Sequence, residues 1–295
     1  MKYILDNVKK YEQDEVYTLS FLIDGTKVAY VSQRMEKLKH LRMNTDGFYL
    51  RAGKVMNDFE LGNTIDEEKF FDLQKRLIQM GCTTVVVYSD IPYVRQFLPC
   101  LENTRELMKK SAIDYVIGIK VSCHLVTPTL VIKCKQEKIP IILVETKSIE
   151  QLETIVWERV KEAMIYYQPL IVPVLKDDVN LSVEEKNDLL IKCRKYVAEK
   201  KMLTYISFPD AHIPFEKNLC KIAGLYPKKG VLHVGSDVDY NLYMEGQDGN
   251  DFEPDIVVLR GKILKVNETI YCEPRFGEEV RIKVPGHFIP IDLAH

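Results

Sequence analysis

Short β-rich runs occupy both ends of the chain, and apolar runs alternate with longer helical stretches between them. Near the N-terminus, the runs Tyr17–Ile23 and Lys27–Ser32 are joined at Asp24-Gly25, which is a strong hairpin signal. A further short strand is predicted at Phe48–Leu50. After Gly224 the β pattern returns. The strands predicted there are Val231–Val234, Tyr240–Tyr243, Asp255–Leu259, Lys262–Val266 and Thr269–Tyr271, with a hairpin turning at Arg260-Gly261-Lys262.

The part of the chain after Gly53 predicts strands and helices in alternation. Ser182 followed by Glu185 forms a capping-box pattern, and Ser148 followed by Gln151 resembles one, so each serine predicts the start of a helix. Strands that alternate with helices run parallel and have the helices packed outside them. The predicted strands are Val55–Met56, Thr84–Tyr88, Tyr115–Lys120, Pro140–Glu145, Leu170–Leu175 and Leu203–Ser207. The predicted helices cover roughly residues 66–80, 92–110, 127–137, 148–166, 182–201 and 214–223.

The order of these elements predicts how the chain is organised. It is β-rich, then consists of about six β/α units, and is then β-rich again. Because both ends have the same character, we expect them to pack together as one small β domain beside the central part. Residues 1–52 and 225–295 are assigned to this composite β domain, and residues 53–224 to the β/α domain.

Composition and charge narrow the functional classes. The chain has 295 residues, of which 46% are hydrophobic and 28% charged, which suffices for a sizeable core. A net charge of −2 does not favour nucleic-acid binding, and the paired lysines, among them Lys228-Lys229, are interpreted as solvated. We find neither a signal peptide nor an apolar run near the ~20 residues of a membrane helix, so no membrane partner is expected. Seven scattered cysteines without a Cys-x-x-Cys pair predict no disulfide, no structural zinc and a cytoplasmic location.

Several stretches resemble the amidohydrolase superfamily, and most closely its dihydropyrimidinase, hydantoinase and dihydroorotase branch. The segment "GLYPKKGVLHVGSDVDYNLY" is similar to the turn, the basic residue and the Gly-Ser-Asp-x-Asp motif with which that branch leaves its barrel. The later "VLRGKILKVNETIYCEPRFGEEV" resembles its closing strands. In the first half, "FLIDGTKVAYVS", "DGFYLRAGKVMNDFEL", "FDLQKRLIQMGCTTVVVYSD" and "IDYVIGI" resemble its opening hairpin, its barrel entry and its next barrel strands. The resemblance implies an α/β fold with a TIM-like β/α barrel next to a composite β domain.

The implied barrel is truncated. Residues 53–224 hold about six units, whereas a complete (β/α)₈ barrel typically takes ~250 residues. A barrel that lacks strands exposes sheet edges, which must be covered or paired. We therefore expect a homodimer or larger assembly that covers the open side. The competing expectation is a monomer in which the predicted helices 148–166 and 182–201 fold across the gap.

The resemblance also implies where metal ligands would stand. Active members of the family bind divalent metals through a His-x-His after the first barrel strand, a lysine or glutamate after the fourth, two further histidines and a late aspartate. Here Asp58 and Glu60 stand in place of the His-x-His, and alternate residues of a strand share a face. These carboxylates could bind a hard cation such as Mg²⁺, Mn²⁺ or Ca²⁺. The alternative is a pair of solvated acids at the start of a loop.

The candidate site residues later in the chain match the motifs of the family less closely. Glu145 could supply a carboxylate at a strand end, or it could start the loop before Ser148. The stretch "ISFPDAHIPFEKN" resembles the family's final Asp-His-Ala-Pro region. On this basis Asp210 is a candidate catalytic aspartate and His212 a candidate metal ligand. The alternative is a plain loop before a helix that begins at Pro214.

Two hypotheses from different classes remain. In the first, the chain is an amidohydrolase-like pseudoenzyme without the His-x-His and without a cofactor, which acts as a non-catalytic binding or scaffold protein. Its partners would be a second copy or another protein, with a small molecule as a possible ligand. In the second, it is a metal-dependent hydrolase of cyclic amides or other C–N bonds, with a carboxylate-rich divalent-metal site. We favour the first, because both the imidazole ligands and barrel strands are lost, and we expect Asp58, Glu60 and Asp210 not to converge on a metal.

Overall fold

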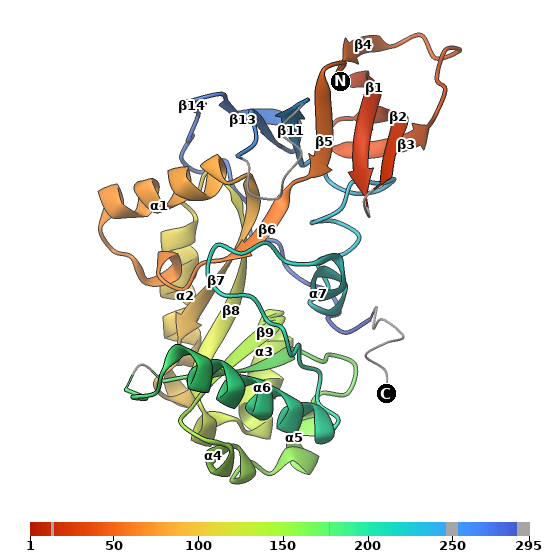
Figure 1. The fold of residues 1–295 in the computed structure, drawn as a ribbon. Helices are drawn as coiled ribbons and strands as arrows, with labels where there is room; N and C mark the ends of the chain where they lie inside the picture. Colours follow the sequence, from red (N-terminus) through yellow and green to blue (C-terminus); the bar gives the residue numbers. More distant parts are fainter. Residues whose placement is uncertain (13–14, 177, 246–252, 288–295) are drawn as a thin grey trace.

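The chain folds around two β-sheets, one parallel and one mixed (Figure 1). The structure is a computed structural model that describes residues 1–12, 15–176, 178–245 and 253–287, with the side chains of residues 11–16 left aside. Within these residues the parallel sheet has five strands and the mixed sheet nine. Residues 246–252 and 288–295 of the predicted β domain lie outside the described part. None of the described helices is long and apolar enough to cross a membrane.

The parallel sheet is formed by the central part of the chain, as the alternation of strands and helices predicted. Its strands, in spatial order, are β6 (Lys54–Asn57), β7 (Cys82–Asp90), β8 (Asp114–Ser122), β9 (Ile141–Thr146) and β10 (Leu170–Leu175). The α-helices are α1 (Glu67–Gln79), α2 (Phe97–Met108), α3 (Pro128–Glu137), α4 (Ile149–Glu153), α5 (Trp157–Ala163), α6 (Val183–Glu199) and α7 (Lys217–Ile222). Short 3₁₀ turns are η1 (Leu61–Asn63), η2 (Val94–Gln96) and η3 (Cys123–Leu125).

Helix boundaries follow the local signals in part. At α6 the predicted capping box is present, because the Ser182 side chain accepts from the Glu185 N–H and the Glu185 carboxylate accepts from the Ser182 N–H. The predicted helix 148–166 is wrong as one element, since it is divided into α4 and α5. The indole N–H of Trp157 donates to the carbonyl of Leu152 at 3.0 Å, so a side chain satisfies one of the carbonyls at the end of α4.

The predicted sixth strand, Leu203–Ser207, is wrong, and the parallel sheet is a half-barrel rather than a six-unit barrel. After α6 the chain crosses from one edge of this sheet to the other instead of running along an edge. At the β10 edge, the Ile171 N–H donates to the Leu203 carbonyl at 2.8 Å. At the β6 edge, the Phe215 N–H donates to the Val55 carbonyl at 2.7 Å. A segment that spans both edges cannot form a continuous ladder with either of them.

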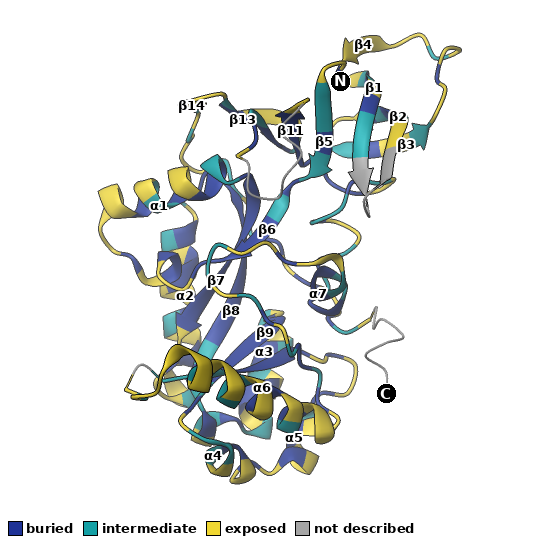
Figure 2. Ribbon diagram, viewed as in Figure 1, coloured by how far each residue is buried: buried dark blue, intermediate teal, exposed yellow. Residues whose placement is uncertain are grey.

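The two faces of the parallel sheet have different coverings. Alternate side chains of a strand point to opposite faces. Along β7, Val85 and Val87 lie on the outer face, in a buried cluster that also contains residues of the helices α1 to α6. Val86 lies on the inner face, in a buried cluster that also contains residues of α7. Val280 and Ile282, from the end of the described chain, complete this inner cluster. We expected a second subunit to cover the open side of the barrel, but the inner face of the half-barrel is covered by the same chain. Figure 2 shows the strands of this sheet as mostly buried.

The mixed sheet contains strands from both ends of the chain. Its strands are β1 (Lys2–Glu12), β2 (Glu15–Asp24), β3 (Lys27–Ser32), β4 (Leu41–Asn44), β5 (Phe48–Ala52), β11 (Tyr240–Met244), β12 (Ile256–Leu259), β13 (Lys262–Val266) and β14 (Thr269–Ile270). The order is β14-β13-β12-β11-β5-β1-β2-β3, with β4 beside β1. Antiparallel pairing of β5 with β11, which places Leu50 opposite Leu242, joins the N-terminal and C-terminal strands. The expectation that both ends share one sheet is confirmed, and the exact domain boundaries stay a prediction.

Sequence patterns missed some elements of this sheet. The strand β1 contains a bulge between Leu5 and Val8, where Asn7 adopts a positive φ of 55°, and this interrupts the period of two that marks a strand. In the C-terminal part, the predicted strand Val231–Val234 is wrong, because the chain turns there instead. The Ser236 hydroxyl closes the turn by donating to the carbonyl of His233 at 2.8 Å.

Candidate functional site

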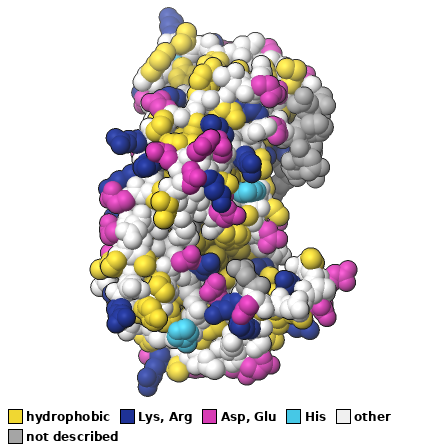
Figure 3. Space-filling model, turned by 90° about the vertical axis from the view of Figure 1, so that its left-hand side faces the viewer, with side chains coloured by type: hydrophobic (Ala, Val, Ile, Leu, Met, Phe, Trp, Pro, Cys, Tyr) yellow, Lys and Arg dark blue, Asp and Glu magenta, His cyan; other side chains and the backbone are white. Residues whose placement is uncertain are grey.

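Charged side chains gather at the carboxyl edge of the parallel sheet, which is where β/α barrels place their chemistry. Asp58 directly follows β6, Asp90 ends β7, and Glu145 lies near the end of β9. The Nζ of Lys120, on β8, lies 3.1 Å from a carboxylate oxygen of Asp90 and 3.7 Å from one of Glu145. Figure 3 shows one face of the molecule hollowed at mid-height, with hydrophobic side chains in the hollow and charged ones around it.

Asp58 and His212, both predicted candidates, are in contact at this edge. The Asp58 Oδ2 lies 2.9 Å from the His212 Nε2, although 154 positions separate the two residues. Asp58 is buried, and its Oδ1 accepts the N–H groups of Glu60 and Leu61 at 2.9 and 2.7 Å, so it caps the turn η1. His212 adopts a left-handed backbone conformation with φ 65°, and its N–H donates to the carbonyl of Asn57 at 3.0 Å. Both oxygens of Asp58 are therefore engaged by the protein itself.

The remaining candidates have other surroundings. Glu60 is exposed, and its carboxylate lies 2.9 Å from the Nζ of Lys69. Asp210 lines a pocket beside α6, while Glu145 faces Lys120. Within the described residues, none of the predicted candidates belongs to a group of at least three metal-ligating atoms lying within 4.8 Å of one another. The structure thus brings Asp58 and His212 together but does not assemble the predicted ligand set.

We predict that Asp58 stabilises the carboxyl edge. The substitution Asp58→Ala removes the acceptor of one buried and one part-buried N–H group and the partner of His212, so the free energy of unfolding should fall by about 2 kcal/mol. Urea unfolding followed by circular dichroism measures this change. Glu60→Ala is the matched control, because that carboxylate is exposed, and it should leave the unfolding midpoint unchanged. Equal effects of the two substitutions would contradict the role assigned to Asp58.

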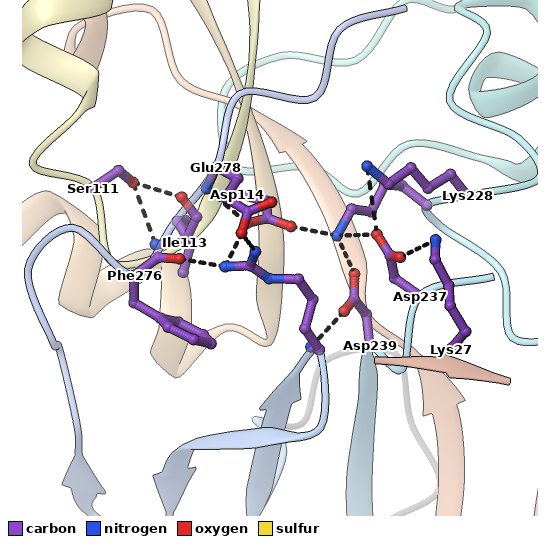
Figure 4. A network of polar contacts seen from close by, with 11 residues as sticks. Lys27, Ser111, Ile113, Asp114, Lys228, Asp237, Asp239, Phe276 and Glu278 are labelled. Carbon is purple, nitrogen blue, oxygen red and sulfur yellow. Dashed lines mark hydrogen bonds and ion pairs between the residues drawn. The ribbon is translucent and has the colours of Figure 1, made fainter. Parts of the chain in front are cut away.

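A buried lysine lies among carboxylates at the opposite end of β8 (Figure 4). The Lys229 side chain is 0% exposed, and its Nζ lies 2.5 Å from Asp114, 2.9 Å from Asp237 and 2.7 Å from Asp239. All the partner carboxylates are themselves buried. A buried ammonium is stable only where opposite charges and hydrogen bonds replace its hydration, and here the carboxylates of these aspartates do so.

The same cluster connects the two sheets. Asp114 begins β8 of the parallel sheet, and Asp239 immediately precedes β11 of the mixed sheet. The guanidinium of Arg260, between β12 and β13, lies 3.3 Å from Asp114, and its backbone N–H donates to Asp239 at 2.8 Å. The N–H of Glu278 also donates to Asp114, at 2.9 Å. The charges therefore hold the C-terminal strands against the amino end of the parallel sheet.

Burial and charge act in opposite directions on the titration of this cluster. Burial alone would lower the pKa of the Lys229 ammonium, but the charges of Asp239, Asp114 and Asp237 outweigh it and raise this pKa above its usual value. Burial raises the pKa of the Asp239 carboxyl to about 6, although Lys229 opposes this shift. For Asp237, burial is outweighed by Lys229 and Lys27, which hold the pKa of that carboxyl below its usual range.

This cluster does not fit a metal ion. Asp114, Asp237 and Asp239 offer oxygens within 4.8 Å of one another, the spacing a cation needs. The ammonium of Lys229, however, already lies within hydrogen-bonding distance of an oxygen of each. A divalent cation would have to displace a fully buried positive charge, so the cluster is an internal ion network.

The sequence interpretation of Lys228-Lys229 as a solvated pair is wrong for Lys229. Lys228 is 48% exposed in its side chain, whereas Lys229 is completely buried. The available signal was the Gly-Ser-Asp-x-Asp motif, which places Asp237 and Asp239 at alternate positions shortly after the lysines. Asp114 carried no comparable signal, because it lies 115 positions away from Lys229.

Comparison with known proteins places the fold. No family model matches the sequence, and no curated protein sequence matches it. Solved structures do match. A dihydropyrimidinase from Brevibacillus agri is 14% identical, with a TM-score of 0.60 and alignment over 98% of this chain and 100% of that one. A D-hydantoinase from a Bacillus sp. is 11% identical with a TM-score of 0.70, over 98% and 100% of the two chains. An L-hydantoinase from Arthrobacter aurescens is 12% identical with a TM-score of 0.55, over 95% and 99%.

Identities this low demonstrate a shared fold and not a shared activity. The three matches extend over 95–98% of this chain, so they cover both the half-barrel and the mixed sheet built from both termini. The chain therefore has the amidohydrolase-type fold of the dihydropyrimidinases and hydantoinases.

Proposed function

We propose that this protein is a pseudoenzyme of the amidohydrolase fold, which acts by binding rather than by hydrolysis. The main support is the state of Asp58, which stands in place of the first histidine of the family's His-x-His. Its Oδ1 caps η1 and its Oδ2 contacts His212, so both oxygens are already engaged by protein groups. Glu60, in place of the second histidine, points to Lys69 at the surface. A hard cation needs several oxygen ligands that converge on it.

The alternative is a metal-dependent hydrolase of cyclic amides or other C–N bonds. One observation favours it, namely the contact between Asp58 and His212 at the edge where β/α barrels hold their catalytic groups. A divalent metal there would require Asp58 to leave the N–H groups that it caps, and Glu145 to leave Lys120. The residues as arranged do not fit such an ion, so the alternative requires a local rearrangement.

Metal analysis combined with an activity assay distinguishes these functions. We expect protein dialysed against Mg²⁺, Mn²⁺ or Zn²⁺ and then desalted to retain far less than one ion per chain. Ring opening of dihydropyrimidines or hydantoins is measured as the loss of their ultraviolet absorbance. We expect this loss to be no faster with the protein than in buffer alone. Stoichiometric metal together with ring opening that His212→Ala abolishes would overturn the pseudoenzyme and establish the hydrolase.

Assembly is a separate part of the proposal. The inner face of the half-barrel is covered within the chain, so the proposed self-association is assigned to the mixed sheet. There β3, which carries Tyr30, is an end strand, and β4, which carries Leu41 and Met43, pairs with β1 alone among the described strands. These three residues are 52%, 63% and 50% exposed. End strands with exposed apolar residues are suited to pairing with another chain.

Light scattering tests this self-association. We expect a mass of at least twice 34.2 kDa at micromolar concentration, and a monomer for Tyr30→Lys, since a charge on an end strand opposes pairing. A substitution of the same kind away from the mixed sheet, Tyr166→Lys, should leave the mass unchanged. A 34.2 kDa species for the unsubstituted protein would refute the self-association.

A further inference from the structure

A pocket of about 420 Å³ lies between α6 and the segment 205–219, apart from the Asp58–His212 contact. Its volume falls within the roughly 300–1,000 Å³ typical of small-molecule sites. The apolar part of its wall is formed by Leu190, Ile191, Ile206, Phe208, Ile213 and Pro214. The polar part is formed by Arg194, Asp210, Glu216 and Tyr205. Apolar walls with a few charged groups are the usual composition of a ligand site.

Arg194 carries the positive charge of this wall, and its Cζ lies 6.0 Å from the centroid of the Phe208 ring. It is only 7% exposed, and among the described residues its charge interacts with Asp210 without an ion pair within 4.0 Å. Its Nη1 donates to the carbonyls of Ile206 and Phe208 at 2.8 and 3.3 Å, and its Nε donates to the carbonyl of Pro173 at 3.4 Å. The Nη2 has no hydrogen-bond partner among the described residues. A buried guanidinium without a bound anion is costly, and a carboxylate is the group that its geometry matches.

Negative charge lies in the wall of the same pocket. Asp210 is close enough to Arg194 to interact with it electrostatically, but the two do not form an ion pair. Glu216 accepts the hydroxyl of Tyr205 at 2.7 Å and also lines the pocket. The pocket thus presents one buried positive group and two carboxylates beside an apolar wall. A ligand that carries charge of only one sign would meet repulsion from part of this wall.

We propose that this pocket binds a small zwitterion with an apolar tail, namely a free α-amino acid with a branched aliphatic side chain. The carboxylate of the ligand pairs with Arg194, and its ammonium group with Asp210. The aliphatic side chain packs against Ile191 and Ile213, which are 39% and 50% exposed without a ligand. This inference goes beyond the proposed function, because such a site requires neither hydrolysis nor a macromolecular partner.

Calorimetric titration of the full-length protein with L-leucine tests the proposal. We expect saturable binding of L-leucine with one site per chain. We expect binding weaker by about tenfold or more for 4-methylpentanoate, which lacks the ammonium, and for 3-methylbutylamine, which lacks the carboxylate, because each loses a charged hydrogen bond. Binding of either analogue as tight as that of L-leucine would overturn the zwitterion assignment. So would the absence of heat for L-leucine at millimolar concentration.

A pair of matched variants assigns the binding to this pocket. Asp210→Asn keeps the shape of the side chain and removes the charge, and it should weaken L-leucine binding by about tenfold. Asp188→Asn, the same change at an exposed position of α6 outside the pocket, should leave it unchanged. Arg194→Lys should also weaken binding, and circular dichroism checks that the variant is folded. Full affinity of a folded Asp210→Asn protein would place the ligand elsewhere. Because metal content and ring opening are measured separately, a failure here leaves the proposed function untouched.

Discussion

Replacing Lys229 by methionine is expected to lower the free energy of unfolding by about 3–5 kcal/mol, which is the usual effect of removing one partner from a buried ion network. Methionine fills a similar volume but leaves the carboxylates of Asp114, Asp237 and Asp239 buried without the ammonium between them. Urea unfolding at neutral pH measures the loss. The same cluster joins both sheets, so the loss should appear in the global transition and not as fraying of one part.

Lys228→Met is the matched control for this prediction. Lys228 is the neighbouring residue, its side chain is 48% exposed, and its Nζ lies 4.0 Å from Asp237. Because Lys228 is half-exposed and its contact with Asp237 is long, we expect this pair to contribute at most about 1 kcal/mol. If the two methionine variants unfolded at the same urea concentration, the buried cluster would not have the stabilising role that we assign to it.

The difference in unfolding free energy between the unsubstituted protein and Lys229→Met should also depend on pH. The surrounding carboxylates raise the pKa of Lys229 in the folded state above its ordinary value of 10.5. Its contribution is therefore fully present below about pH 10.5 and is lost as the pH rises through the higher folded value. The gap in unfolding free energy between the unsubstituted protein and Lys229→Met should shrink in this alkaline range. Buried tyrosines titrate nearby but are present in both proteins, so their effect cancels in the difference.

Shortening Leu219 to alanine should lower the free energy of unfolding by about 2–5 kcal/mol, the range for buried leucines. Leu219 lies on α7, is 0% exposed, and packs in the inner cluster of the half-barrel with Val86 and Phe215. A complete barrel fills its interior with side chains from its own strands. Here α7 performs that role, so a cavity under α7 should affect the whole inner face.

Leu98→Ala provides the comparison for Leu219→Ala. Leu98 also lies in a helix, α2, but is 44% exposed, so its truncation should cost well under 1 kcal/mol. Thermal unfolding followed by calorimetry gives both values. A Leu219→Ala protein as stable as Leu98→Ala would show that α7 does not support the inner face of the sheet.

Local patterns in the chain determined the parallel sheet well. Leu170–Leu175 is predicted and found with the same bounds, because a short continuous apolar run is buried on both faces whatever its neighbours are. Ser182 and Glu185 begin α6 as predicted, since a capping box needs only residues of the first helical turn. The prediction of a strand at Leu203–Ser207 is wrong, because the conformation there depends on distant parts of the chain. Tyr205 is buried and Leu203 partly buried against the inner face, because the chain crosses here between two sheet edges, and hydrophobic periodicity does not record that path.

In the candidate site, the sequence identified single residues, but only the tertiary structure showed their contacts. Asp58 and His212 could be singled out from family motifs, but their contact spans 154 positions, and the commitment of Asp58 to capping η1 is visible only in the fold. The local signal at Lys229 was the Gly-Ser-Asp-x-Asp motif that follows it, and this motif does not show that the lysine is buried. A lysine becomes buried only where carboxylates distant in sequence replace its hydration, and here Asp114 comes from the other sheet. Hydrophobic periodicity thus specified the elements, because it depends on neighbours a few residues away, whereas the tertiary structure decided which charges are compensated.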